Sequence, residues 1–215
     1  NILITINIYI LIVMSILDIK KPIWFMRQAG RHLPEYRRIR SKKENFLEFC
    51  FDKKSVIEAT LQPIKRYKID CAIIFCDILI VPYILGQRIS FVKGEGPLLE
   101  SLSLQELIDL KPLSQKKKDI KNTYDAIKEI RKKLNKNKSL IGFCGGAWTL
   151  SCYMIDGNSK DGFANSLNWL KSFNKNLEDL INILIIYIVE HLYKQYLYGC
   201  DTLMIFESWA GIVPE

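Results

Sequence analysis

Five arginines lie close together in residues 22–40, PIWFMRQAGRHLPEYRRIR. A guanidinium group stays charged at physiological pH and can bind a planar carboxylate or phosphate through two hydrogen bonds, which lysine cannot do. Arg27 and Arg31 flank Ala29 and Gly30, where the backbone can approach a ligand closely. We therefore predict an oxyanion site at Arg27 and Arg31. The other three arginines fit a solvated charged face: Arg37, Arg38 and Arg40.

A single carboxylate, Asp77, follows the apolar run Cys71–Phe75 and precedes Ile78–Val81. An unpaired buried charge is unfavourable, so the protein or a ligand must supply partners. A structural acid that caps a helix or pairs with an arginine would also explain this residue. Its position after an apolar strand favours a functional role, because a fixed anion in a dry pocket stabilises a cationic transition state.

Six sequence blocks resemble those of the uroporphyrinogen decarboxylase family, in the same order and at similar spacing. The first is RQAGR followed by LPEYR in the arginine segment. The others are LQPIKRY at 61–67, CAIIFCDILIVPYILG at 71–86, GEGP at 94–97, IGFCGGAWTLSCYMIDG at 141–157 and LMIFESWAG at 203–211. The resemblance covers roughly residues 22–215, and six blocks in register are far more specific than one motif.

The resemblance implies a carboxy-lyase of haem and porphyrin biosynthesis. Such an enzyme removes the four acetate carboxyls of uroporphyrinogen III and gives coproporphyrinogen III. A transiently protonated pyrrole accepts the electrons left by carbon dioxide, so we expect no metal and no organic cofactor. The family's site maps onto Arg27, Gln28, Ala29, Gly30, Arg31, Asp77, Tyr153 and Ser208.

The roles implied for these residues differ. Asp77 would accept hydrogen bonds from the pyrrole N–H groups and stabilise the protonated ring. Arg27 and Arg31 would bind substrate carboxylates, and Arg27 is also a candidate proton donor, although a guanidinium is a very weak acid. Tyr153 and Ser208 would contact the substrate. The family's later site histidine has no counterpart here, so we expect this chain alone to be inactive.

Two other functions stay open. A corrinoid or methylthiol methyltransferase shares the barrel but depends on zinc held by His and Cys in its later half. A non-catalytic tetrapyrrole-binding fragment would bind the macrocycle without turnover. The RQAGR block favours the decarboxylase over the methyltransferase. The family also implies a homodimer for the full-length enzyme.

Short apolar runs, separated by helical patterns, predict buried strands of a parallel α/β sheet. One such helix is expected from Ser55, as its N-cap, to Tyr67. This architecture fits the family's (β/α)₈ TIM-type barrel, in which residues after the strands gather at one mouth. The expected strands are Cys71–Phe75, Ile89–Val92, Leu140–Phe143 and Thr202–Phe206.

The domain organisation follows from the strand count. A barrel of this type takes about 250 residues and eight strands, whereas four strands can be placed in these 215 residues. We therefore interpret residues 22–215 as the incomplete N-terminal part of one barrel domain. Such a part would expose two sheet edges and aggregate. Residues 1–21 form an apolar leader, either a targeting segment or a non-native one.

The formal charge of +8 is concentrated in residues 111–138, which hold eleven Lys and Arg against three Asp and Glu. Apolar residues recur there at three- and four-residue spacing, which predicts an amphipathic helix with solvated lysines. Its apolar residues are Ile120, Tyr124, Ile127, Ile130 and Leu134. No aromatic residues alternate with the lysines as in a single-strand-binding surface, so we predict no nucleic-acid partner.

The six cysteines contain no CxxC pair, and the only histidines are His32 and His191. This composition predicts buried free thiols in a reducing compartment and no metal site. His191, on a long apolar helix, is expected to be structural. The apolar run of this leader, residues 1–17, is broken by Thr5 and Asn7 and is shorter than the roughly 20 residues of a spanning helix, so we expect no stable membrane insertion. We predict a cytoplasmic protein, with a plastid as the alternative if the leader is a targeting segment.

Overall fold

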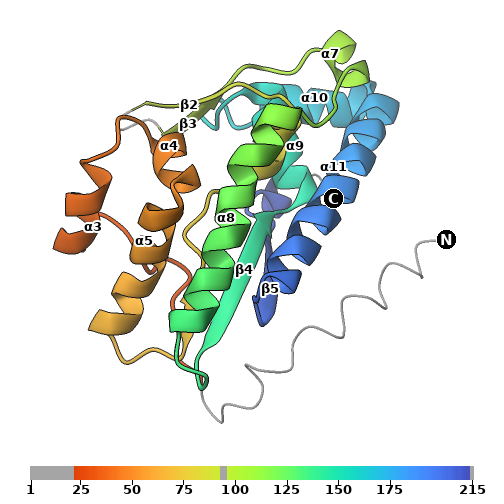
Figure 1. Ribbon diagram of the computed structural model, residues 1–215. Helices are drawn as coiled ribbons and strands as arrows, with labels where there is room; N and C mark the ends of the chain where they lie inside the picture. The colour runs from red at the N-terminus through yellow and green to blue at the C-terminus, as the bar shows by residue number, and fades with distance from the viewer. Residues whose placement is uncertain (1–21, 93–95, 214–215) are drawn as a thin grey trace.

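The computed structural model describes residues 22–92 and 96–213, with a parallel sheet at its centre (Figure 1). The sheet holds β1 (Cys71–Ile73), β4 (Ser139–Gly145) and β5 (Thr202–Phe206) in the order β1-β4-β5. All residues of β4 are buried, as expected for a central strand covered on both faces. The parallel α/β prediction is confirmed, and the expected leader, residues 1–21, lies outside the described residues.

The strand register aligns the carboxyl ends of β4 and β5, whereas β1 ends opposite the third residue of β4. Ile73, the last residue of β1, lies opposite Ile141 of β4, and Gly145 at the end of β4 lies opposite Phe206 at the end of β5. Side chains that follow these strands are therefore placed at one edge of the sheet, as a barrel requires.

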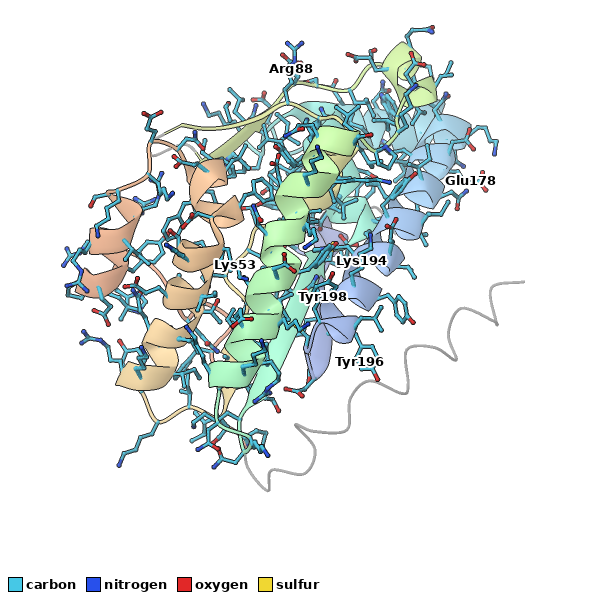
Figure 2. All side chains as sticks on the ribbon, viewed as in Figure 1. Lys53, Arg88, Glu178, Lys194, Tyr196 and Tyr198 are labelled. Carbon is cyan, nitrogen blue, oxygen red and sulfur yellow. The ribbon has the colours of Figure 1, made fainter. Side chains whose placement is uncertain are left out.

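Three long helices lie side by side along the sheet: α5 (Lys53–Arg66), α8 (Ser114–Lys133) and α11 (Asn174–Leu197) (Figure 1). On α11, Glu178 and Tyr196 extend outwards, whereas Lys194 lies towards α8, 5.8 Å from the Tyr124 ring (Figure 2). The remaining helices are α3 (Pro34–Arg40), α4 (Phe46–Phe51), α6 (Ile80–Ile84), α7 (Leu104–Ile108), α9 (Ala147–Asp156), α10 (Ala164–Ser172) and the 3₁₀ turn η2 (Ala210–Ile212).

The basic segment forms α8, which confirms the predicted amphipathic helix. The apolar residues named from its spacing are all buried and pack in the core with β1 and β4. Helix α5 begins three residues earlier than predicted, because its N-cap is Asp52 rather than Ser55. The Asp52 carboxylate accepts hydrogen bonds from both the backbone N–H and the hydroxyl of Ser55. Ser55, although its residue type suits an N-cap, therefore lies in the first turn of α5.

The prediction of a parallel barrel strand at Ile89–Val92 is wrong. This segment is β2, and it pairs antiparallel with β3 (Gly96–Leu99) in a separate two-stranded sheet. Ser90 is exposed whereas Ile89 and Phe91 are half-buried, which is the alternation of a hairpin with one solvated face. The connection to β3 is also too short for the crossover that parallel neighbours need.

The free edge of β1 is covered by the segment that leads to the arginines. The backbone N–H of Asp70 donates to the Ile23 carbonyl at 2.7 Å, and the N–H of Ile23 donates to the Asp70 carboxylate at 2.8 Å. Further along, Gln28 binds the Cys71 carbonyl and the Ile73 N–H through its side chain. The expectation of two exposed sheet edges is therefore wrong for β1, because polar groups of residues 23–28 satisfy its backbone.

The buried polar and sulfur groups agree with the sequence predictions. All six cysteines are free, and five are buried. His191 is 2 % exposed, and its Nδ1 lies 2.9 Å from the Tyr124 hydroxyl, so it has the expected structural position. Within residues 22–92 and 96–213, no helix is long and apolar enough to cross a membrane.

Helix α11 is fastened to β4 by Gln195, which gives a first prediction. The Gln195 amide donates to the Phe143 carbonyl and accepts from the Phe143 N–H, both at 2.8 Å. Replacing Gln195 with alanine leaves two buried backbone groups without these partners, and should lower the free energy of unfolding by about 2–4 kcal/mol. Urea denaturation measures this loss, with Gln115→Ala on the exposed side of α8 as the control. Equal stability of both variants would contradict it.

Candidate active site

A cavity of about 340 Å³ lies at the carboxyl ends of the strands, beside the arginine segment. Arg27, Gln28 and Ala29 form one side of it, and Ser208, two residues beyond the end of β5, contributes a hydroxyl. The rest of the lining is mainly apolar: Met26, Ile73, Ile74, Phe75, Cys76, Ile78, Phe143 and Phe206. The cavity thus combines a cation and a hydroxyl with a large apolar wall, which suits an amphiphilic anion.

Arg27 is the cation of this cavity. Its side chain is exposed, and neither a hydrogen bond nor an ion pair joins it to another described residue. Arg27 also lines a second cavity of about 330 Å³, together with His32, Phe25 and Tyr67. Arg27 therefore lines both cavities, and the N–H donors of its guanidinium are available for a ligand's carboxylate.

The two residues that follow Arg27, Gln28 and Ala29, contribute differently to the cavity wall. Gln28 is buried, and its side-chain amide donates to the Cys71 carbonyl at 2.8 Å and accepts from the Ile73 N–H at 3.3 Å. The side chain of Gln28 is thus used to fasten the loop to β1, so any substrate contact by this residue would come from its backbone. Small Ala29 leaves room at the cavity wall.

Asp77 lies just past β1, between Cys76 and Ile78, which line the cavity. It is half-buried and is itself absent from the lining. Its Oδ1 accepts a hydrogen bond from the Leu79 N–H at 2.8 Å. Desolvation raises the pKa of Asp77 to about 6, and the Leu79 hydrogen bond offsets only part of this effect. No arginine compensates the carboxylate in the described residues, so it is a weakly partnered anion in an apolar setting.

Tyr153 lies on α9, and it does not line the cavity. Its ring packs edge to face with Phe163 at 5.5 Å and with Trp209 at 6.4 Å between centroids. Because Trp209 follows Ser208 directly, Tyr153 contacts the loop that carries the cavity's hydroxyl. The Tyr153 hydroxyl forms no hydrogen bond with another described residue, and its substrate contact stays a prediction.

The other residues of the arginine segment differ in exposure and in the contacts that they make. Arg31 is exposed without an ion pair in the described part of the chain, and Gly30 accepts a turn hydrogen bond from Leu33 at 3.0 Å. Arg37 and Arg38 are exposed, as predicted for a solvated face. The remaining arginine of that prediction, Arg40, is only half-exposed, since it donates to the Lys43 carbonyl at 2.7 Å and lies 5.9 Å from the Phe49 ring.

Sequence reasoning missed two aromatic residues that line this cavity and the hydrogen bond made by one acid beside it. Phe143 and Phe206 line the cavity with ring centroids 5.3 Å apart. Both lie within the strands already predicted, but that they share a face follows from the register of β4 and β5, in which Phe143 lies opposite Met204, two residues before Phe206. The acid is Glu207, whose carboxylate accepts a hydrogen bond from the Thr149 N–H at 2.6 Å. No local pattern marks a contact between residues so distant in sequence.

The sequence of this chain is similar to those of known proteins, which is evidence independent of the geometry. The sequence profile of the uroporphyrinogen decarboxylase (URO-D) family matches residues 19–215. A uroporphyrinogen decarboxylase of Orientia tsutsugamushi is 48 % identical over 90 % of this chain and 56 % of its own length. A second one, from Rickettsia bellii, is 45 % identical over 93 % of this chain and 58 % of its own length. The chain thus spans a little over half the length of these curated relatives.

A solved structure resembles the fold as a whole. A methyltransferase from Methanosarcina mazei superimposes with a TM-score of 0.68 at 16 % identity, over 87 % of this chain and 54 % of that chain. At this identity the likeness concerns the fold alone. It agrees with the three parallel strands and their flanking helices as part of a TIM-type barrel.

Proposed function

The chain belongs to the uroporphyrinogen decarboxylase family, and from this premise we propose that the full-length protein containing it converts uroporphyrinogen III into coproporphyrinogen III. The observation that carries the proposal is the cavity at the strand ends, where Arg27 and Ser208 face an apolar wall next to the weakly partnered Asp77. A polyacidic pyrrole macrocycle matches this cavity, because its carboxylates can bind Arg27 and its apolar ring system can pack against the apolar wall.

The proposed chemistry assigns each group one task. Arg27 and Arg31 bind side-chain carboxylates of the substrate, and the Ser208 and Tyr153 hydroxyls donate to them. A pyrrole ring is protonated, and Asp77 stabilises the resulting cation. The bond between the acetate methylene and its carboxyl then breaks, carbon dioxide leaves, and the electron pair is taken up by the cationic ring. A proton is added to the methylene carbon to give a methyl group, and the ring then releases the proton that it took up first, so that one proton is consumed for each carbon dioxide. Arg27 is the candidate donor of one of these protons.

This scheme needs Asp77 in its ionised form. Because the pKa of Asp77 is raised to about 6, the carboxylate forms as the pH rises through that value. The kcat/KM of the full-length protein, which reports groups of the free enzyme, should therefore increase between about pH 5 and 7.

The direct test measures uroporphyrinogen turnover by the full-length protein. We expect coproporphyrinogen to form, and the rate to be unchanged after treatment with EDTA, because the proposed steps use neither a metal nor a cofactor. Binding of uroporphyrinogen without turnover would indicate a tetrapyrrole-binding protein instead. Absence of uroporphyrinogen turnover, together with zinc-dependent methyl transfer by the same protein, would point to the methyltransferase alternative.

We also propose a domain organisation, an oligomeric state and a compartment for the full-length protein. Residues 22–215 would belong to one barrel domain, and the family match, which begins at residue 19, supports a boundary near residue 21. The full-length protein would form a homodimer without nucleic acid, and sedimentation of the purified protein tests the dimer. The relatives named above are bacterial, which favours the cytoplasm over a plastid.

A further inference from the structure

Glu207 is held at the N-terminus of α9 although it belongs to the loop after β5. Its Oε1 accepts a hydrogen bond from the Thr149 N–H at 2.6 Å. The first turn of a helix has free N–H groups and a partial positive charge, so a carboxylate is favoured there. The close approach also requires Gly146, because a Cβ at that position would overlap the Glu207 carboxylate.

Two more hydrogen bonds fix the same loop to the same helix. The Trp209 N–H donates to the Thr149 hydroxyl at 3.1 Å, and the Trp148 indole N–H donates to the Trp209 carbonyl at 2.9 Å. The Trp209 ring packs edge to face against Phe163 at 4.8 Å. Both residues that flank Ser208 are therefore bound to the start of α9, one by its side chain and the other by its backbone.

Ser208 lies between these two anchored residues and lines the cavity together with Arg27. Glu207 does not line the cavity, so it can act on a ligand only through its neighbours. We infer that Glu207 is a positioning residue that fixes the Ser208 hydroxyl at the cavity. This inference rests on the proposed function only where it names substrate carboxylates as the groups that Ser208 meets.

The kinetic test compares substitutions in the full-length protein. In Glu207→Ala the anchor is lost, and KM for uroporphyrinogen should rise about ten-fold while kcat changes less than about two-fold. This pattern is expected because a contact made equally in the ground and transition states affects KM alone. Glu207→Gln keeps an oxygen acceptor for the Thr149 N–H and should restore most of the affinity. Gly146→Ala, which displaces the carboxylate, should reproduce the alanine effect.

Tryptophan fluorescence supplies a readout that does not need activity. Releasing the loop should shift the emission of Trp209 to longer wavelength in Glu207→Ala, with Trp209→Phe used to assign the signal. The control is Glu178→Gln, because the Glu178 side chain is 62 % exposed on α11 (Figure 2). It should change neither KM nor emission.

The outcomes separate this inference from the proposed function. A wild-type protein that forms no coproporphyrinogen would contradict the function, while the Trp209 emission would still decide whether Glu207 anchors the loop. The inference is overturned if Glu207→Ala leaves both KM and emission unchanged. It is also overturned if the variant lowers kcat at constant KM, since that would make Glu207 part of the chemistry. Should Glu207→Ala not fold, the same criteria apply to Glu207→Gln and Gly146→Ala.

Discussion

Replacing Asp77 with asparagine is expected to lower the kcat for uroporphyrinogen by a factor of about 10²–10³, the loss typical of removing one preorganised electrostatic group. Asparagine has nearly the same shape and keeps an oxygen that can accept the hydrogen bond from the Leu79 N–H. The substitution thus removes the negative charge and little else. Steady-state turnover by the full-length protein measures the effect, and an unchanged kcat would exclude the proposed role of the Asp77 carboxylate.

The same substitution should stabilise the fold above pH 6. The pKa of Asp77 is about 6 in the folded protein against an ordinary value of 3.8, so between these values the folded state binds more protons than the unfolded state. Stability therefore falls as the pH rises through this window, and the full penalty is present above it. Removing the charge should raise the free energy of unfolding by roughly 1–3 kcal/mol at pH 8 and by little at pH 4.

Urea denaturation of wild type and Asp77→Asn at pH 4 and pH 8 checks this prediction. Asp161→Asn, at an exposed turn position, is the matched control and should show no such pH-dependent gain. A gain in stability combined with a loss of turnover would mark Asp77 as a residue kept for function at the expense of the fold. A variant that is less stable than wild type at pH 8 would contradict the prediction.

The parallel sheet could be predicted because its strands are continuous apolar runs. Thr202–Phe206 is observed with the predicted ends, and Leu140–Phe143 is the centre of the longer β4. Ile89–Val92 was misjudged because a short apolar run does not reveal whether its next partner is parallel or antiparallel. The connection to β3 is too short for a parallel crossover and therefore requires an antiparallel pair. The apolar pattern of the strand alone does not show this.

The candidate site could be predicted in its residue types but not in its contacts. The prediction of Arg27 and Ser208 as site residues agrees with their place at one cavity. What Gln28 binds, and where the Glu207 carboxylate lies, depends on backbone groups more than 40 residues away along the chain. Such contacts follow from how the strands and helices are packed together. Asp77, by contrast, could be identified locally, because its apolar neighbours in sequence contribute to the desolvation that raises its pKa.

Removing the guanidinium of Arg27 should raise KM for uroporphyrinogen by about 10- to 100-fold, because hydrogen bonds to charged groups contribute roughly 1.5–3 kcal/mol. Arg27→Lys should recover only part of this loss, since lysine restores the charge without the planar fork that binds a carboxylate through two hydrogen bonds. Arg37→Ala, which removes an exposed arginine of α3, is the control and should leave KM within about two-fold of wild type. Equal effects of Arg27→Ala and Arg37→Ala would show that general positive charge suffices.

The effect of Arg27→Ala on kcat separates carboxylate binding from proton donation. A residue that only holds a carboxylate, equally in the ground and transition states, changes KM and leaves kcat unchanged. A residue that also donates the proton must lower kcat when it is removed. Because a guanidinium holds its proton far more tightly than any group that titrates near neutral pH, we expect the first pattern. A fall in kcat at saturating uroporphyrinogen would instead assign the proton transfer to Arg27, and Arg27→Lys would then restore kcat more than it restores KM, because an ammonium group gives up its proton more readily.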